Sequence, residues 1–206
     1  MPEISSSLLL NSSDTWMKVW KIEESKDFFE NLPNSWLDWI YLAKKNEISQ
    51  IESISARFCL FKLCQSLDLA DVKLLSETSG IPYFENNDLQ ISLTHSFPYV
   101  AAVISKKKGI GIDIEKKGRN IAKIAPRFLS TEEYHKWHQN EAKLTLAWSA
   151  KESVYKALKI PGLSFKKSIL LPEFNENLIQ LQVMEKNIHV EWEIFDDFVL
   201  TLATSD

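Results

Sequence analysis

The chain has 206 residues, and its 24 Lys and Arg against 28 Asp and Glu give a formal charge of −4. Hydrophobic residues make up 45% and charged residues 25%, which excludes a disordered chain, a collagen-like fibre and a coiled coil. The mild acidity excludes a broadly basic nucleic-acid binder, so we expect no nucleic-acid partner. Only five glycines argue against a glycine-rich phosphate loop.

The sequence predicts neither a signal peptide nor a membrane span, because the apolar run at residues 8–10 is short and has no basic segment before it. Cys59 and Cys64 are separated by about 7.5 Å along the axis of a predicted helix, which is too far for an easy disulfide. We therefore expect two reduced core thiols in a soluble, cytoplasmic protein that makes no membrane contact.

The first part of the chain is expected to begin with a loose, Ser- and Asn-rich segment over residues 1–14. Alternating apolar residues predict a strand over 15–22, and helical spacing predicts a helix over 35–45 and a long helix over 49–67. Gly80-Ile81-Pro82 marks a turn. Three β-like runs follow it, at 89–95, 99–105 and 109–114.

The second part repeats this order. Short helices are expected over 120–138, and a second long helix over 141–158 ends before Pro161-Gly162. Three more β-like runs close the chain, at roughly 178–185, 187–195 and 197–203. Each half is thus expected to contain one long helix followed by three strands.

From this repeated order we predict an α+β fold built from two similar halves that form a pseudo-dimer. Each half would pack its long helix on a mostly antiparallel, three-stranded sheet. We place the halves at residues 1–108 and 109–206, with one active site at the interface between them.

The run Gly109–Glu115 (G-I-G-I-D-I-E) suggests the first candidate site. Side chains alternate on a strand, so Asp113 and Glu115 point one way while Ile112 and Ile114 point into the core. Two carboxylates on one face can share a divalent cation, and without a cation they repel each other. The alternative is a solvated strand end.

The run Trp148–Lys156 (W-S-A-K-E-S-V-Y-K) suggests the second. On a helix Trp148, Glu152 and Lys156 share one face, which is also the pattern of an ordinary surface Glu–Lys pair. In the functional interpretation Glu152 is a third carboxylate ligand, and Lys151 and Lys156 neutralise phosphate oxygens. Three carboxylates without clustered Cys or His indicate Mg²⁺, which keeps positions open for substrate phosphates.

A third segment, Ile91–Ser96 (I-S-L-T-H-S), is a predicted strand that ends in polar groups at a turn containing proline. His95 is either a hydrogen-bonded turn histidine or a contact to an anionic ligand. The segment alone does not decide between these interpretations.

Taken together, these segments resemble the motifs of the 4′-phosphopantetheinyl transferase superfamily, in its larger, pseudo-dimeric, surfactin-synthetase-activating type. The resemblance spans roughly residues 50–165, and the ordered set is far more specific than any single motif. The similar runs are I-S-L-T-H-S at 91–96, G-I-D-I-E at 111–115, F-L-S-T-E-E-Y at 128–134, W-S-A-K-E-S-V-Y-K at 148–156 and G-L-S at 162–164.

The resemblance implies an enzyme that transfers the 4′-phosphopantetheine arm of coenzyme A to a serine hydroxyl of a carrier protein, releasing 3′,5′-ADP. The cofactor would be Mg²⁺, and the partner an acyl, polyketide or peptidyl carrier protein. A monomer is expected, because one chain would supply both halves of the site. The alternatives are a non-catalytic carrier-binding module of the same fold and a Mg²⁺-dependent phosphoesterase.

The resemblance also implies residue roles. The metal-binding carboxylates match Asp113, Glu115 and Glu152. The glutamate proposed as general base matches Glu133, with Glu132 as its rival, and Lys156 matches a catalytic lysine that contacts phosphate.

Further positions match contacts to coenzyme A: Arg57, Thr94, His95, Lys151 and Lys156. Thr94 and His95 would contact the nucleotide end, and Arg57 would lie near the 3′-phosphate. Ile81 stands where the family often has a lysine, so one cation expected to face a phosphate is missing.

Overall fold

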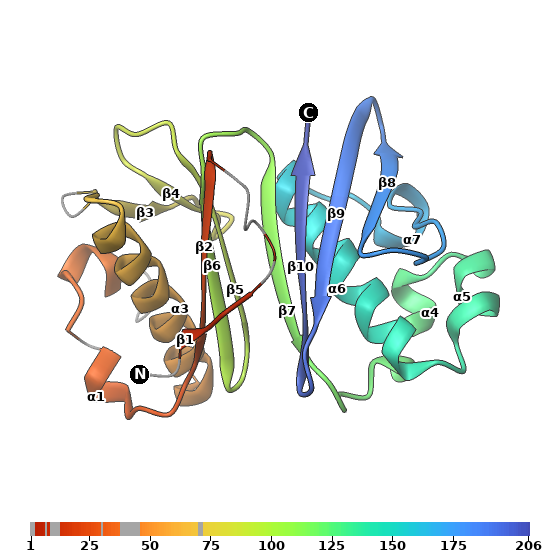
Figure 1. Ribbon diagram of the computed structural model, residues 1–206, viewed down its shortest axis with the longest axis horizontal. Helices are drawn as coiled ribbons and strands as arrows, with labels where there is room; N and C mark the ends of the chain where they lie inside the picture. The colour runs from red at the N-terminus through yellow and green to blue at the C-terminus, as the bar shows by residue number, and fades with distance from the viewer. Residues whose placement is uncertain (1–2, 7, 9–12, 30, 38–45, 70–71) are drawn as a thin grey trace. The chain divides into compact units, whose positions relative to one another are not determined.

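The computed structural model describes residues 3–6, 8, 13–29, 31–37, 46–69 and 72–206. They form two compact units, Met1–Lys107 and Lys108–Asp206, and each unit is described by itself (Figure 1). No helix among the described residues is long and apolar enough to span a membrane.

The N-terminal unit contains a four-stranded antiparallel sheet in the order β1-β2-β6-β5 (Figure 1). A short hairpin of β3 and β4 forms a separate two-stranded sheet. The strands are β1 (Glu3–Ile4), β2 (Thr15–Lys21), β3 (Leu74–Ser76), β4 (Pro82–Phe84), β5 (Gln90–Ser96) and β6 (Tyr99–Ser105), and the helices are α1 (Lys26–Phe29) and α3 (Glu47–Ser66).

Helix α3 begins where the Asn46 side chain accepts hydrogen bonds from the backbone N–H groups of Ile48 and Ser49, which would otherwise lack a partner within the helix. Its inner face buries Phe58 against Trp20 and Phe29, with ring centroids 5.7 and 5.3 Å away and nearly perpendicular planes. This aromatic cluster fixes the helix on the sheet.

Cys59 and Cys64 on the same helix are buried and free, as expected from their spacing. Burial raises the pKa of each thiol to about 12.

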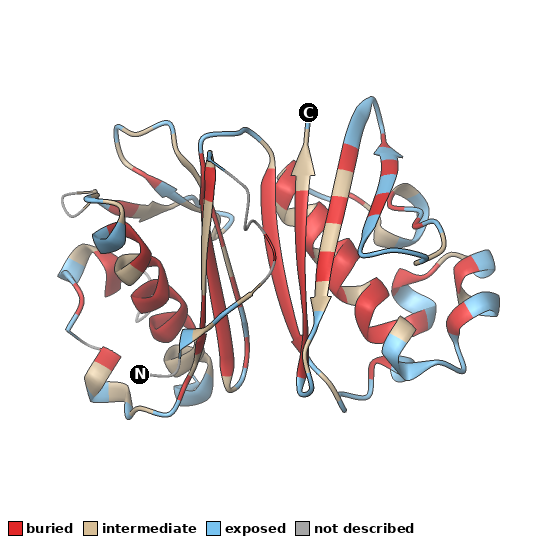
Figure 2. Cartoon of the chain, viewed as in Figure 1, coloured by how far each residue is buried: buried red, intermediate tan, exposed pale blue. Residues whose placement is uncertain are grey.

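The C-terminal unit contains a second four-stranded antiparallel sheet, in the order β7-β10-β9-β8, with α6 packed against β7 and β10 (Figures 1 and 2). The strands are β7 (Ile110–Lys116), β8 (Leu178–Val183), β9 (Lys186–Ile194) and β10 (Phe198–Ser205). The helices are η1 (Ile121–Lys123), α4 (Ala125–Phe128), α5 (Thr131–Trp137), α6 (Glu141–Leu158) and α7 (Phe165–Ser168).

Helix α6 lies very close to β7 because Gly111 has no side chain. A Cβ atom at this position would lie 2.0 Å from the carbonyl oxygen of Ser153 and 2.5 Å from the amide nitrogen of Ala157. All residues of β7 except the last are buried, as Figure 2 shows for this strand. The close approach brings the middle of α6 over Asp113 and Glu115.

The α+β fold with two helix-and-sheet halves is confirmed, but each main sheet has four strands where we predicted three. The prediction erred on the third β-like run: it is β7, which pairs with β10 in the C-terminal unit. In the N-terminal unit β2 pairs with β6, and β1 with β2.

Strand β1 and the β3–β4 hairpin were not predicted. Strand β1 lies in the segment expected to be loose, and the β3–β4 hairpin flanks the predicted turn at Gly80. Of the helix predicted over 35–45, residues 38–45 lie outside the described residues.

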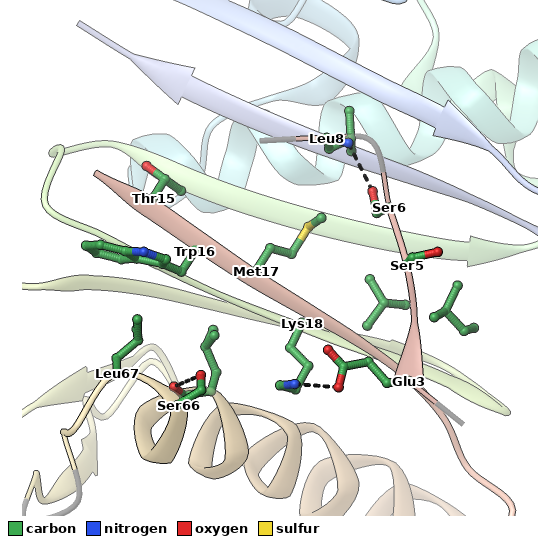
Figure 3. A pocket seen from close by; sticks show the side chains of 13 residues that line it. Glu3, Ser5, Ser6, Leu8, Thr15, Trp16, Met17, Lys18, Ser66 and Leu67 are labelled. Atoms are coloured by element: carbon green, nitrogen blue, oxygen red, sulfur yellow. Dashed lines mark hydrogen bonds and ion pairs between the residues drawn. The ribbon is translucent and has the colours of Figure 1, made fainter. Parts of the chain in front are cut away.

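A cavity of about 540 Å³ opens beside β2 in the N-terminal unit (Figure 3). Its two ionisable lining residues, Lys18 and Glu3, pair with each other at 2.7 Å. The rest of the lining is apolar or hydroxylic, including Trp16, Met17 and Leu67. This cavity offers no uncompensated charge to a ligand, and the chemistry-bearing residues lie elsewhere.

Candidate functional site

Strand β7 places Asp113 and Glu115 one pleat apart, in register with Thr201 and Val199 of β10. Both carboxylates are buried, with relative exposures of 4% and 6%. The predicted alternation puts them on one face of the strand, but this face is covered by α6 rather than solvated. A buried carboxylate is stable only with compensating charge or hydrogen bonds.

Helix α6 supplies those partners from the face that the sequence predicted. The Lys156 ammonium donates to Asp113 Oδ1 at 2.7 Å and to the carbonyl oxygen of Ile112 at 3.1 Å. The Trp148 indole N–H donates to Glu115 Oε1 at 2.8 Å. Because Trp148 and Lys156 lie on the same face of α6, this one face contacts both carboxylates of β7.

Glu152 lies between Trp148 and Lys156 on this face. Burial first and then the Asp113 charge raise the pKa of Glu152 to about 7, with Glu115 adding to the rise and Lys156 opposing it. Burial and then the Asp113 charge also raise the pKa of Glu115, while Arg119 lowers it. The three predicted carboxylates thus sit close enough to repel one another.

Arg119 is a functional candidate that sequence reasoning missed. Its guanidinium donates to Glu115 Oε2 at 2.8 Å, so Arg119 and Trp148 engage the two oxygens of the same carboxylate. The sequence does place an acid and a base four residues apart, Glu115 and Arg119. The chain between them forms a turn at Gly118 and not a helix, so helical spacing does not identify the pair.

The donor set fits a hard divalent cation, because it consists of carboxylate oxygens whose mutual repulsion a cation would relieve. In the present arrangement, however, the described residues contain no group of three or more His, Cys, Asp or Glu side chains that could hold a metal ion. Lys156 and Arg119 engage Asp113 and Glu115 instead.

Lys151, which we predicted to contact coenzyme A, is engaged by protein groups in this structure. Its side chain has no exposure, and its ammonium lies within 2.7–3.0 Å of Glu133 Oε2 and the carbonyl oxygens of Phe128, Phe165 and Ile169. An ammonium has three protons to donate, so these contacts exhaust it. Lys151 ties α4, α5 and α7 to α6.

Glu133, which we predicted as the general base, is also held by structural contacts. Its Oε2 accepts from the Ser130 backbone N–H and from Lys151, and its Oε1 accepts from the Leu171 N–H. With Ser130 it forms the capping box that starts α5. A base must reach the proton that it takes, whereas this carboxylate is buried and fully engaged.

Its rival Glu132 is exposed and pairs with Lys136 one helical turn away at 2.7 Å. This is the ordinary surface pair of a short helix. Neither glutamate of the run is therefore positioned by the described contacts as a base.

The predicted nucleotide contacts lie in the N-terminal unit. His95 near the end of β5 is partly exposed, and its Nδ1 lies 3.4 Å from Glu52 Oε2 on α3. Glu52 Oε1 accepts from the Phe97 N–H, so one carboxylate ties α3 to the β5–β6 turn. Thr94, the preceding residue, points to the opposite side of the strand and is buried.

Arg57 is buried on α3, and its Nη1 donates to the Ser53 carbonyl oxygen at 3.3 Å. Burial lowers the pKa of its guanidinium to about 10. Ile81 precedes β4, where its carbonyl oxygen accepts from the Glu77 N–H. Neither side chain's predicted relation to a phosphate follows from these contacts, and both stay predictions.

Residues 109–203 match a known family, the 4′-phosphopantetheinyl transferase superfamily. The C-terminal unit belongs to this superfamily. The matched residues include all three carboxylates and Lys156, whereas Arg57, Thr94 and His95 lie outside the match.

Two curated proteins are similar to the chain. Enterobactin synthase component D of Salmonella typhimurium is 33% identical over 129 residues, and that of Salmonella typhi is 30% identical over 132 residues. Each alignment covers 55% of this chain and 55% of the relative, so the chain spans about half the length of the relatives that it matches.

Proposed function

We propose that this protein is a holo-carrier-protein synthase. It transfers the 4′-phosphopantetheine arm of coenzyme A to a serine of an acyl, polyketide or peptidyl carrier protein and releases 3′,5′-ADP. The observation that supports this most is the group of Asp113, Glu115 and Glu152 with Lys156, in a unit that belongs to the phosphopantetheinyl transferase superfamily.

The reaction breaks the pyrophosphate of coenzyme A and forms a phosphodiester on the serine oxygen. The pyrophosphate is negatively charged, and further negative charge develops on the departing 3′,5′-ADP as the bond between the two phosphates breaks, so cations must neutralise it. The Lys156 ammonium, bonded to Asp113 Oδ1 and 27% exposed, is the cation on α6 able to turn from that carboxylate to a phosphate oxygen. We therefore assign Lys156 a phosphate contact.

Asp113, Glu115 and Glu152 would hold the Mg²⁺. When bound, Mg²⁺ polarises phosphate oxygens and neutralises their charge. The carboxylates' own part is to supply hard oxygen ligands from two elements that Gly111 allows to approach closely.

We assign the nucleotide end of coenzyme A to the N-terminal unit. The partly exposed His95 would contact it, with Thr94 and Arg57 as further positions taken from the family resemblance. A monomeric state and a cytoplasmic location belong to the same proposal. Lys151 and Glu133 are left out of the reacting groups, because their contacts bind them to each other.

The test is a transfer assay with coenzyme A, Mg²⁺ and a panel of apo carrier proteins, read by the intact mass of each carrier. We expect one phosphopantetheine arm per carrier on at least one member of the panel, and no mass gain with EDTA in place of Mg²⁺. Failure on every carrier by a protein shown to be folded would reject the proposal.

Two other outcomes would each replace the proposal. Carrier binding without transfer or coenzyme A affinity would indicate a non-catalytic binding module. Release of phosphate or 3′,5′-ADP from coenzyme A without any carrier would indicate a phosphoesterase.

A further inference from the structure

Arg119 forms an ion pair with Glu115, one of the carboxylates that the proposed function assigns to a metal. Its Nη1 lies 2.8 Å from Glu115 Oε2, and the side chains are 57% and 8% exposed. The ion pair therefore joins a largely solvated cation to a buried anion. An exposed guanidinium is easily displaced, whereas a buried carboxylate needs some positive partner.

A divalent cation at Glu115 and the guanidinium of Arg119 would compete for the same negative charge. Both are cations, so they repel each other when close, and each gains most from the carboxylate when the other is absent. In this structure Arg119 and Lys156 engage the carboxylates of β7, Arg119 at Glu115 and Lys156 at Asp113.

The structure also provides a place for a displaced Arg119. A cavity of about 320 Å³ is lined by Arg119 together with Gly118, Asn120, His138 and Glu141. Glu141, in the first turn of α6, gives this cavity a carboxylate of its own. The guanidinium could therefore leave Glu115 without losing an acidic neighbour.

We propose that Arg119 is an internal counter-cation that a divalent metal must displace from Glu115, and that it thereby sets the metal affinity of the site. The inference rests on the proposed function only for the identity of the metal-binding carboxylates. In this role Arg119 opposes metal binding, so replacing Arg119 should tighten the binding of the metal. A residue that positioned Glu115 for the metal would have the reverse effect.

The test measures binding of Mn²⁺, a spectroscopic stand-in for Mg²⁺, to the full chain without coenzyme A or carrier. Free Mn²⁺ is followed by electron paramagnetic resonance. Arg119→Gln is expected to bind Mn²⁺ about two- to fivefold more tightly than the wild type, the range of a displaced, largely solvated ion pair. Arg119→Lys keeps the charge and should stay within about twofold of the wild type.

Arg127→Gln is the matched control, because it removes the same charge from an exposed position on α4 in the same unit. It should leave the affinity within about twofold of the wild type. Thermal melts of all variants check that each is folded.

Unchanged or weaker Mn²⁺ binding by Arg119→Gln would overturn the inference, and so would an equal gain in the Arg127→Gln control. Absence of Mn²⁺ binding by every protein would overturn it too. The carrier assay separates the two proposals. Transfer by the wild type together with unchanged affinity in Arg119→Gln rejects only the role of Arg119. Tighter binding together with no transfer rejects only the proposed reaction.

Discussion

The fold opposes the ionisation of Glu152. Burial first, and then the charges of Asp113 and Glu115, raise its pKa from 4.5 to about 7. The folded metal-free protein therefore binds more protons than the unfolded chain between these two pH values. The contribution of Glu152 to stability therefore falls as pH rises through this window, and the loss is complete above pH 7.

The substitution Glu152→Gln should remove this penalty. At pH 8 in EDTA we expect the variant to be more stable than the wild type by up to about 3 kcal/mol, and at pH 4.5 or below the difference should vanish. Urea unfolding at a series of pH values measures it. An equal slope of stability against pH in both proteins would contradict the account of Glu152.

Lys151 and Glu133 form a buried pair in which each charge depends on the other. Lys151→Met should cost about 3–5 kcal/mol of unfolding free energy, because it leaves Glu133 buried without its cation. Lys151→Met combined with Glu133→Gln should recover part of this loss. Urea unfolding of the single and double variants measures the coupling.

If Lys151 contacts coenzyme A, as the family resemblance alone suggested, the outcome would differ. Lys151→Met would then be nearly as stable as the wild type but would bind coenzyme A weakly.

His95 offers a test in the N-terminal unit. His95→Ala should raise the KM for coenzyme A several-fold with little change in kcat, because it would remove a contact made equally in the ground and transition states. His135→Ala, an exposed histidine on α5, serves as the matched control and should leave both constants unchanged. A loss confined to kcat would contradict the role of His95.

At the scale of elements, the packing of α6 on β7 brings the carboxylates together. Gly111→Ala would place a methyl group 2.0 Å from the Ser153 carbonyl oxygen, and both elements would have to move apart. We expect a loss of about 3 kcal/mol or more, together with loss of transfer activity.

Gly162→Ala is the matched control for Gly111→Ala. Gly162 has a φ of +74° but open space where a Cβ atom would lie, so it should cost only about 1–2 kcal/mol. Urea unfolding measures both variants. Equal costs would show that close approach at Gly111 is not required.

Helices and strands were predictable where a single hydrophobic periodicity dominated the sequence. The helix patterns over 49–67 and 141–158 correspond to α3 and α6, and the closing β-like runs to β8, β9 and β10. Which sheet a strand joins was not predictable, because a run of apolar residues does not indicate which strand it pairs with. Strand β7 follows β6 closely in sequence yet pairs with β10.

The candidate site was likewise predictable only where the spacing of residues decided which face of an element they share. Four-residue spacing on α6 and alternation on β7 brought Lys156 to Asp113. The buried role of Lys151 was not predictable, because a lysine beside a glutamate in a helix does not show which of them faces the core. Its backbone acceptors are the carbonyl oxygens of Phe128, Phe165 and Ile169, which lie 23, 14 and 18 residues from Lys151 in the sequence.

For the whole molecule, a net charge of −4 describes the arrangement poorly. Within the C-terminal unit, acids and bases are paired at short range around β7 and α6, with Asp113 against Lys156 and Glu115 against Arg119. This pairing is what metal and substrate phosphates would have to rearrange. We therefore propose that the three carboxylates hold the cation on which phosphopantetheine transfer depends.

The most direct measurement is the rate of phosphopantetheine transfer to an apo carrier by the wild type, Glu152→Gln and Glu185→Gln, followed by intact mass across a Mg²⁺ titration. Glu185, an exposed glutamate between β8 and β9, is the matched control. We predict that Glu152→Gln loses at least about 100-fold in rate and needs more Mg²⁺, because a charged ligand is removed, while Glu185→Gln matches the wild type. Full activity of Glu152→Gln at low Mg²⁺ would contradict the account.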